Sequence, residues 1–249
     1  MAQGAAIVTG GSRGIGRAIV DRFLADGIDV LTCGRGSRPA DLAARALWLQ
    51  ADVSRSVDAG RIVTEARSRF GQVTILVNNA GVQVEKTVSE TTDEDWDLVM
   101  GVNAQGTFNM CRAVLPGMEE TGGVIVNIGS ISGLVSDPSL AVYNGSKAFV
   151  HALTRSIAID HGPKVRCNAV SPGWIATGMA DDAFALAKNP TAAKADALAR
   201  HAVRRLGRPE DVASMVAWLA SDQAAFTTGQ CFICDGGLTA ATPIQPRLF

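Results

Sequence analysis

An α/β fold built on a doubly wound parallel sheet is the fold class that this sequence predicts. Three observations predict it: short apolar runs alternate with stretches of helical spacing, these runs are continuously apolar, and a glycine-rich loop follows the first one. Strands buried on both faces are continuously apolar, and regular strand–helix alternation places helices on both faces of a parallel sheet. A closed eight-stranded barrel is the alternative. It is disfavoured because the sequence contains seven candidate strands.

The first strand, turn and helix lie at the start of the chain. Residues 5–9 (Ala-Ala-Ile-Val-Thr) suit a buried strand, and residues 14–26 carry apolar side chains at helical spacing. Between them, residues 10–16 read Gly-Gly-Ser-Arg-Gly-Ile-Gly. Glycines let the backbone approach a phosphate group, and the free N–H groups at the helix N-terminus can then bind it. The order strand, glycine turn, helix therefore predicts a phosphate-binding loop.

The alternation continues to the end of the chain. Six further strands are expected at residues 28–33, 47–51, 73–77, 123–128, 164–170 and 229–234. Five further helices are expected near residues 54–70, 93–117, 142–161, 180–200 and 209–220. The segment 35–47 is short for a full crossover helix, so we expect the sheet to be thinly covered there. These elements predict a single domain over residues 1–249.

Composition limits the function classes. The chain has 249 residues, 47% hydrophobic residues and a net charge of −1, which gives no argument for nucleic acid or an anionic membrane as a partner. Its longest apolar stretches fall short of the roughly 18 residues of a membrane span. The N-terminus leads directly into the first strand, with no room for a signal peptide. The odd count of five cysteines argues against a disulfide framework, so a cytoplasmic location is expected.

No metal site is expected. Cys231 and Cys234 form a C-x-x-C pair, but they lie in a strand-like run where residues i and i+3 face opposite sides. No second cysteine pair or nearby histidine completes a ligand set, and the chain has no His-rich metal spacing. We interpret both cysteines as small buried residues.

Tyr143 and Lys147 are the strongest candidates for catalysis. They lie four residues apart in Tyr-Asn-Gly-Ser-Lys, on one face of an expected helix, and Tyr143 is the only tyrosine of the chain. A neighbouring ammonium should lower the pKa of the phenol from about 10 toward neutrality and make it a usable general acid or base. The hydroxyl of Ser130, upstream in the sequence, could polarise a carbonyl oxygen beside it.

Together these features resemble the short-chain dehydrogenase/reductase family. Six motifs match it in order: Thr9-Gly10-x-x-x-Gly14-x-Gly16; Asn78-Asn79-Ala80-Gly81; Asn103 in Val-Asn-Ala; Ser130 with Tyr143 and Lys147; residues 166–177 with Pro172-Gly173; and Asp235-Gly236-Gly237. The resemblance implies a Rossmann-type sheet of seven strands in the order 3-2-1-4-5-6-7. It also implies hydride transfer between a nicotinamide cofactor and a carbonyl or secondary alcohol, with ligands at the carboxyl ends of the strands.

The resemblance assigns roles to individual residues. The implied catalytic residues are Asn103, Ser130, Tyr143 and Lys147. Tyr143 would exchange the proton, Lys147 would also hold the nicotinamide ribose, and Asn103 would hold a water that links Lys147 to solvent. A purely structural role for Asn103 remains open. The implied cofactor contacts are Gly10, Ser12, Arg13, Gly14, Ile15, Gly16, Gly34, Arg35, Asp52, Val53, Asn79, Ala80, Gly81, Tyr143, Lys147, Pro172, Gly173, Ile175 and Thr177.

The end of the second strand favours NADP(H) over NAD(H). An NAD site usually has an acidic residue there for the ribose hydroxyls, whereas a 2′-phosphate needs an arginine. Gly34 stands at the acid's position and Arg35 follows it, with Arg38 nearby and Arg13 in the glycine loop. Asp29 precedes the strand and lies at its wrong end. A reductase or dehydrogenase linked to NADP(H) is therefore expected, and an NAD-dependent sugar or polyol dehydrogenase is the alternative.

Substrate identity is less constrained by the sequence. The Ala-rich segment at about 179–200 is expected to form a mobile lid helix, and Gln83, Val84, residues 133–137 and Trp174 are expected to line the pocket. The chain also resembles 3-oxoacyl-[acyl-carrier-protein] reductases, but the acidic turn 118–121 argues against an acidic carrier protein. A non-catalytic cofactor-binding protein is the third possibility, disfavoured by the intact catalytic group. A homotetramer or homodimer is expected from the resemblance.

Overall fold

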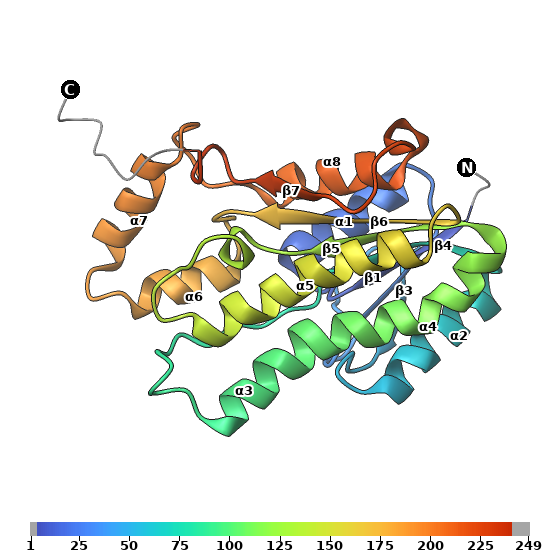
Figure 1. Cartoon of the computed structure of the whole chain (residues 1–249), viewed down its shortest axis with the longest axis horizontal. Coiled ribbons are helices and arrows are strands. Elements are labelled where there is room, and N and C mark those ends of the chain that lie inside the picture. Colours follow the sequence, from blue (N-terminus) through green and yellow to red (C-terminus); the bar gives the residue numbers. More distant parts are fainter. Residues whose placement is uncertain (1–3, 241–249) are drawn as a thin grey trace.

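The computed structural model describes residues 4–240 and confirms the predicted sheet. Within these residues seven parallel strands form one sheet in the order β3-β2-β1-β4-β5-β6-β7 (Figure 1). The strands are β1 (Ala5–Thr9), β2 (Val30–Gly34), β3 (Leu47–Gln50), β4 (Val73–Asn78), β5 (Gly123–Ile128), β6 (Val165–Pro172) and β7 (Cys231–Cys234). The three central strands β1, β4 and β5 are almost entirely buried, as continuous apolar runs require.

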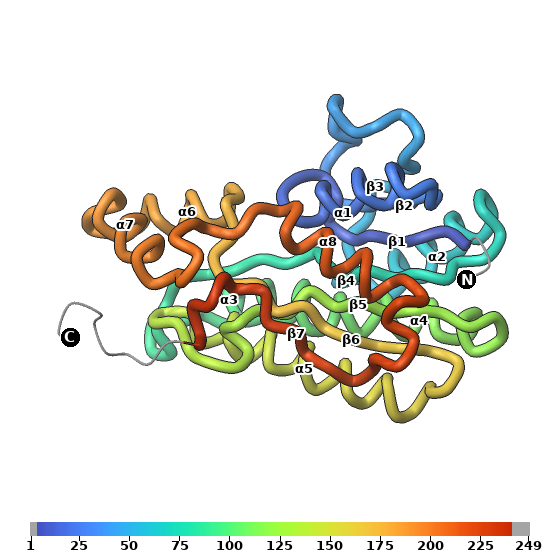
Figure 2. Tube along the Cα trace, turned by 90° about the horizontal axis from the view of Figure 1, so that it is seen from above, coloured from blue at the N-terminus to red at the C-terminus, as the bar shows by residue number. Residues whose placement is uncertain are grey.

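Helices cover both faces of the sheet. They are α1 (Gly14–Ala25), α2 (Ser56–Phe70), α3 (Asp93–Val99), α4 (Gly106–Thr121), α5 (Ala141–Asp160), α6 (Gly178–Leu186), α7 (Pro190–Arg200) and α8 (Pro209–Ala220). One hydrophobic core joins α2, α4 and α5 to the sheet, and a second joins α1 and α8 to its other face. Figure 1 shows α4 and α5 in front of the sheet, and Figure 2 shows α6 and α7 projecting together beyond its end.

Parallel pairing brings the functional loops to one edge. Val8 of β1 lies beside Val77 of β4, and Asn78 of β4 lies beside Asn127 of β5. The carboxyl ends of these strands therefore meet at the same edge of the sheet, where ligands of doubly wound folds bind. The predicted phosphate loop and the segments after β4, β5 and β6 all begin there.

The helix expected at 93–117 is longer and less regular than predicted. A π-helical turn over Met100–Gln105 joins α3 to α4, and α4 continues through Pro116 to Thr121. Proline removes one backbone hydrogen bond, which normally ends a helix. Here Leu115 and Met118 on either side of Pro116 are buried in the core, and this packing outweighs the local cost.

The lid is two helices rather than the single one predicted. Helix α6 ends at Leu186, and α7 begins at Pro190 with the Asn189 side chain accepting a hydrogen bond from the Ala192 N–H (3.0 Å). Proline suits the first turn of a helix but cannot continue the one before it, which explains the break. Phe184 of α6 stacks on Trp174 with ring centroids 4.8 Å apart, so an aromatic contact anchors the lid to the segment after β6.

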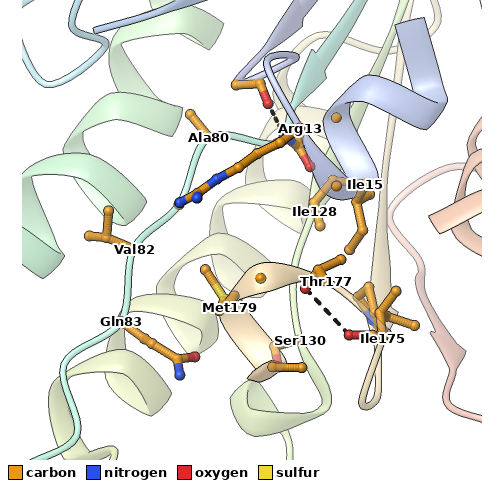
Figure 3. Close-up of a pocket in the computed structure, with 18 of the residues that line it drawn as sticks. Arg13, Ile15, Ala80, Val82, Gln83, Ile128, Ser130, Ile175, Thr177 and Met179 are labelled. Atoms are coloured by element: carbon orange, nitrogen blue, oxygen red, sulfur yellow. Dashed lines mark hydrogen bonds between the residues drawn. The ribbon is translucent and has the colours of Figure 1, made fainter. Parts of the chain in front are cut away.

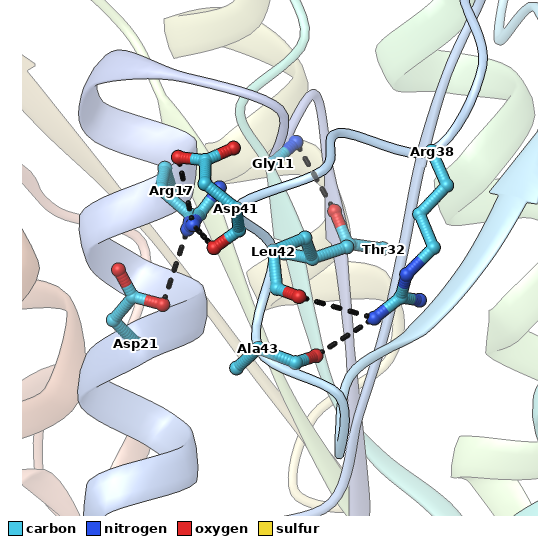
Figure 4. Close-up of polar contacts among 8 residues, drawn as sticks. All are labelled: Gly11, Arg17, Asp21, Thr32, Arg38, Asp41, Leu42 and Ala43. Atoms are coloured by element: carbon cyan, nitrogen blue, oxygen red, sulfur yellow. Dashed lines mark hydrogen bonds and ion pairs between the residues drawn. The ribbon is translucent and has the colours of Figure 1, made fainter.

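The segment between β2 and β3 contains turns and no helix, as its length suggested. Leu42 and Ala46 bury their side chains against the sheet. The Arg38 guanidinium holds the turn together by donating hydrogen bonds to the carbonyl oxygens of Ala43 at 2.8 Å and Leu42 at 3.3 Å (Figure 4). It donates a third bond to the carbonyl oxygen of Ala46 at 2.8 Å. Such bonds satisfy backbone carbonyls that a helix would otherwise have paired.

Three further findings concern the predicted absences. None of the helices in residues 4–240 is long and apolar enough to cross a membrane. Within the same residues there is no group of three or more His, Cys, Asp or Glu side chains that could hold a metal ion. Cys231 and Cys234 were expected to be buried, but they are half-buried because β7 is an edge strand of the sheet.

Candidate active site

A cavity of about 790 Å³ lies at the carboxyl edge of the sheet. Its walls come from the segments that follow β1, β2, β4, β5 and β6, from helix α5 and from the start of α6. Its lining includes every cofactor contact predicted from the sequence, and also Ser130, Tyr143 and Lys147. Figure 3 shows Arg13 and Ile15 on one wall, with Ser130, Gln83 and Met179 on another. A volume of this size is typical of small-molecule and cofactor sites.

The glycine loop fits a bound pyrophosphate. A Cβ atom at Gly16 would lie 2.3 Å from the backbone oxygen of Gly10, and Gly10 and Gly14 have φ values of +71° and +57°. Side chains at these positions would close the loop against the start of α1 or strain the backbone. The open backbone and the N-terminus of α1 therefore form a cradle suited to phosphate groups of a dinucleotide.

Hydrogen bonds between β1 and β4 hold this cradle in place. The Thr9 hydroxyl oxygen accepts bonds from the backbone N–H groups of Asn79 and Ala80, both at 3.0 Å. The Asn79 side chain donates to the carbonyl oxygens of Thr9 (2.9 Å) and Gly10 (3.1 Å). The first two motifs of the sequence are therefore parts of one structural unit.

Helix α5 presents Tyr143 and Lys147 to the cavity, one turn apart as predicted. Lys147 is buried, and its ammonium donates a hydrogen bond to the carbonyl oxygen of Ile128 at the end of β5 (2.8 Å). Its Nζ atom lies 5.6 Å from the centre of the Tyr143 ring. The phenol and the ammonium are therefore close enough to interact by charge.

The pKa of Tyr143 differs from the sequence-based expectation. Burial raises the pKa of the Tyr143 phenol to about 12, outweighing the lowering effect of the hydrogen bond to Ser130, while Asp137 adds a further upward contribution. Burial also lowers the pKa of Lys147 to about 8. Desolvation disfavours both charged forms and is the largest influence on each pKa, so the i,i+4 spacing alone does not set the pKa of the phenol. The phenol is thus held in its proton-carrying form.

Ser130 lies at the turn after β5 in a short chain of hydroxyl groups. Its Oγ accepts a bond from the Ser132 N–H (3.1 Å) and donates to the Ser132 hydroxyl (3.0 Å). The Ser132 hydroxyl in turn donates to Asp137 at 2.6 Å. This arrangement fixes Ser130 at the cavity wall through both its backbone turn and its side chain.

Asn103 is the one predicted catalytic residue that does not line the cavity. It is buried in the π-helical turn, where its side chain accepts from the Val82 N–H (2.9 Å) and donates to the Val82 carbonyl (2.8 Å) and to Ser146 (3.0 Å). Ser146 donates to the Tyr143 carbonyl at 2.7 Å. The Asn103 side chain therefore connects the segment after β4 to helix α5, which is the structural role that the sequence left open.

The end of β2 agrees in part with the prediction. Gly34 and the exposed Arg35 line the cavity, as does Arg13. A Cβ at Gly34 would lie 2.8 Å from the Trp48 ring, so an acidic side chain could not occupy this position without moving the indole. Arg38 was expected near a 2′-phosphate, but it does not line the cavity. Its guanidinium instead donates hydrogen bonds to carbonyl oxygens of the turn between β2 and β3.

The loops that complete the cavity were only partly predicted. Gln83, Asp137 and Trp174 line it as expected, whereas Val84 and residues 133–136 do not. Met179, the first residue of the expected lid, also lines it, and Glu85 lines it although it was not singled out from the sequence. A lone acid two residues after Gln83 carries no motif or periodicity, so no sequence signal could have identified Glu85 as a pocket residue.

The fold and this site define an oxidoreductase that binds a nicotinamide cofactor and acts on CH–OH or C=O groups. The family model described as "Enoyl-(Acyl carrier protein) reductase" matches residues 10–239. The chain belongs to the short-chain dehydrogenase/reductase family, as its motifs indicated.

Three similar proteins illustrate the range of the family. The chain is 41% identical to 2-(S)-hydroxypropyl-CoM dehydrogenase 3 of Xanthobacter autotrophicus, with 94% of this chain and 95% of the relative covered. It is 37% identical to the NADP-dependent (R)-specific alcohol dehydrogenase of Lentilactobacillus kefiri, covering 94% and 96%. The ligand-free structure of Thermoplasma acidophilum aldohexose dehydrogenase superposes with a TM-score of 0.93 at 32% identity, covering 98% and 96%.

Proposed function

We propose that this protein interconverts a carbonyl compound and a secondary alcohol with NADP(H), using Tyr143 as the general acid and base. One observation carries this proposal: Ser130, Tyr143 and Lys147 line the same cavity as the phosphate-binding glycine loop. A phenol, a hydroxyl and an ammonium beside a dinucleotide cradle are the groups that proton exchange at a carbonyl oxygen requires.

The roles of the side chains follow from their protonation states. The cofactor, when bound, supplies or accepts the hydride. Because its pKa is high, Tyr143 carries its proton at neutral pH and can donate it to the carbonyl oxygen. When substrate is bound, the Ser130 hydroxyl turns its single proton from Ser132 to that oxygen and holds it by a hydrogen bond as negative charge develops. The Lys147 ammonium stabilises the phenolate that remains, and in alcohol oxidation the phenolate takes the proton back.

Ser130→Ala tests the assignment of the site. We expect kcat for ketone reduction to fall about 10²–10³-fold, the usual cost of removing one donor to a developing oxyanion. The dissociation constant for NADPH should stay within about twofold, because the glycine loop is untouched. Ser136→Ala, an exposed residue of the same loop outside the cavity lining, is the matched control. Equal turnover in the two variants would show that Ser130 has no role in the reaction.

Two arginines support NADP(H) as the cofactor. Arg35 and Arg13 line the cavity at the end of β2 and in the glycine loop, and Gly34 leaves no carboxylate to repel a 2′-phosphate. The Lentilactobacillus relative is NADP-dependent by name.

Arg35→Ser should weaken NADPH binding about tenfold, because it removes a charge-assisted bond of about 1.5 kcal/mol, and should leave NADH binding unchanged. Fluorescence titration with both cofactors measures this difference, and Arg69→Ser, an exposed arginine on α2 outside this cavity, is the control. If the wild-type protein bound NADH more tightly than NADPH, the alternative of an NAD-dependent sugar or polyol dehydrogenase would replace this assignment.

The structure changes one argument about the acyl-carrier-protein alternative. The acidic turn 118–121 precedes β5 and lies at the amino edge of the sheet, where Glu119 pairs with His161 (2.7 Å). It is therefore remote from the cavity mouth at the carboxyl edge, and it gives no argument against a 3-oxoacyl-[acyl-carrier-protein] reductase. A direct assay with an acyl thioester decides between this activity and the reduction of small ketones.

Assembly into a homodimer or homotetramer in the cytoplasm is part of the proposal. Phe108 on α4 and Phe149 on α5 are exposed aromatic residues on the helices through which we expect copies to associate, and all five cysteines are unpaired. Light scattering that gave a monomeric mass would contradict the assembly.

A further inference from the structure

The substrate side of the cavity has a distinctive set of charges. This side is formed by the segments after β4 and β5 and by the start of α6, and its charged lining residues in the described chain are Glu85, Asp137 and the catalytic Lys147. The arginines of the cavity come from the β1–α1 region and the end of β2, and the Arg13 guanidinium lies 3.9 Å from the place that a Cβ of Gly178 would take. Apart from the catalytic lysine and the Arg13 guanidinium that reaches the start of α6, the charged groups of the substrate side are carboxylates.

Asp137 is coupled to the reacting centre. Its carboxylate can only accept hydrogen bonds, so the Ser132 hydroxyl donates its single proton to Asp137 at 2.6 Å. Ser132 is then left as an acceptor for the Ser130 proton at 3.0 Å. Asp137 thus orients the Ser130 hydroxyl through Ser132, two hydrogen bonds away. The Oδ1 atom of Asp137 has no hydrogen-bond partner within residues 4–240.

A second carboxylate faces the same space. Glu85 accepts one bond from the Gln83 side chain (3.1 Å), and burial raises the pKa of Glu85 above its usual value. Figure 3 shows Gln83 on the same side of the cavity as Ser130. The charged form of a partly desolvated carboxylate with one neutral partner is stabilised by a hydrogen-bond donor or a cation and destabilised by a second anion.

We propose, on the basis of the function assigned above, that Asp137 and Glu85 select substrates with a hydroxyl or ammonium group on the carbon next to the carbinol carbon. The two carboxylates accept hydrogen bonds from that group while Ser130 and Tyr143 hold the reacting oxygen. Anionic substrates are rejected by like charge. The shared chemistry of the preferred substrates is a hydrogen-bond donor beside the reacting carbon, which vicinal diols and amino alcohols both supply.

A series of four alcohols of matched shape tests this selectivity. Propylene glycol, isopropanolamine, sec-butanol and β-hydroxybutyrate share a methyl carbinol centre and differ in a terminal hydroxyl, ammonium, methyl or carboxylate group. Dissociation constants are measured by calorimetry with the enzyme–NADP⁺ complex, and kcat/KM is measured for oxidation. We expect the hydroxyl or ammonium compound to have a dissociation constant about 10²-fold lower and a kcat/KM about 10²-fold higher than the carboxylate compound, as charges about 5 Å apart at an effective dielectric near 20 imply. Whichever of the two ranks first identifies the donor as neutral or cationic.

Variants assign the effect to the named carboxylates. Asp137→Asn, and separately Glu85→Gln, should each reduce the preference for isopropanolamine over sec-butanol about tenfold and improve binding of β-hydroxybutyrate. Asp182→Asn removes an exposed carboxylate of α6 that does not line the cavity, and it should change neither ratio by more than twofold. Because Glu85 has no part in the hydroxyl chain, its variant serves even if Asp137→Asn disturbs folding.

The outcomes separate this inference from the proposed function. Selective binding of donor-bearing alcohols without turnover would support the substrate class and contradict the proposed catalysis. Turnover with β-hydroxybutyrate as the best substrate, or ratios unchanged in both Asp137→Asn and Glu85→Gln, would overturn the substrate class and leave the catalysis intact.

Discussion

Tyr143→Phe should abolish turnover while leaving the protein folded and able to bind cofactor. The substitution removes one oxygen atom from a residue whose pKa of about 12 keeps it protonated at neutral pH, so no charge is lost from the resting site. What disappears is the proton that the carbonyl oxygen must receive. General acid–base catalysis of this kind contributes about 10²–10⁴-fold, and we expect kcat to fall at the upper end of that range because Tyr143 is the only phenol of the chain.

Cofactor titration and thermal unfolding provide the controls for Tyr143→Phe. The glycine loop and the end of β2 do not depend on the phenol oxygen, so the dissociation constant for NADPH should change by no more than about threefold. The melting temperature should fall by no more than about 4 °C, because the half-buried phenol loses one hydrogen bond, to Ser130, worth about 1 kcal/mol. Residual turnover within tenfold of the wild-type rate would show that another group donates the proton. That result would falsify the assigned mechanism and would direct attention to Ser130.

The strands and the placement of the site could be predicted because they depend on local patterns, whereas the order of the strands in the sheet was predicted from the resemblance to the family. Continuous apolar runs identified the strands, and the loop at residues 10–16 located the phosphate cradle between β1 and α1. The spacing of Tyr143 and Lys147 required only that the surrounding segment be helical, which it is. Parallel pairing then brings every such loop to one edge, so the cofactor half of the cavity follows once the strands are known.

Other properties depend on contacts that no sequence pattern encodes. The pKa of Tyr143 moves opposite to the predicted direction because burial, a property of the whole cavity, outweighs the hydrogen bond to Ser130. Arg38 was expected near a phosphate, but its guanidinium binds carbonyl oxygens that become available only when residues 35–47 fold as turns. The single lid helix was predicted from the Ala-rich composition on both sides of Pro190. The structure instead begins a new helix at Pro190, because proline cannot continue the helix before it.

Lys147→Met should abolish turnover and at the same time stabilise the protein at neutral pH. Burial lowers the pKa of Lys147 from 10.5 to about 8, which means that the folded protein binds this proton less readily than the unfolded chain does. Below pH 8 both states are protonated and the folded state bears the full cost of the buried charge. A shift of this size corresponds to about 3 kcal/mol, of which roughly 1 kcal/mol is offset by the bond to Ile128 that methionine cannot make.

The pH dependence of unfolding distinguishes this explanation from a general packing effect. Between about pH 8 and 10.5 the unfolded chain binds more protons at Lys147, so the free energy of unfolding of the wild-type protein should rise with pH in that window. Lys147→Met should therefore be about 2 kcal/mol more stable than wild type at pH 7, a melting temperature several degrees higher, and should lose this advantage toward pH 10. Lys164→Met, at an exposed lysine, should show neither effect. A stability gain that persisted unchanged at pH 10 would contradict the buried-charge explanation, because it would not depend on the protonation of Lys147.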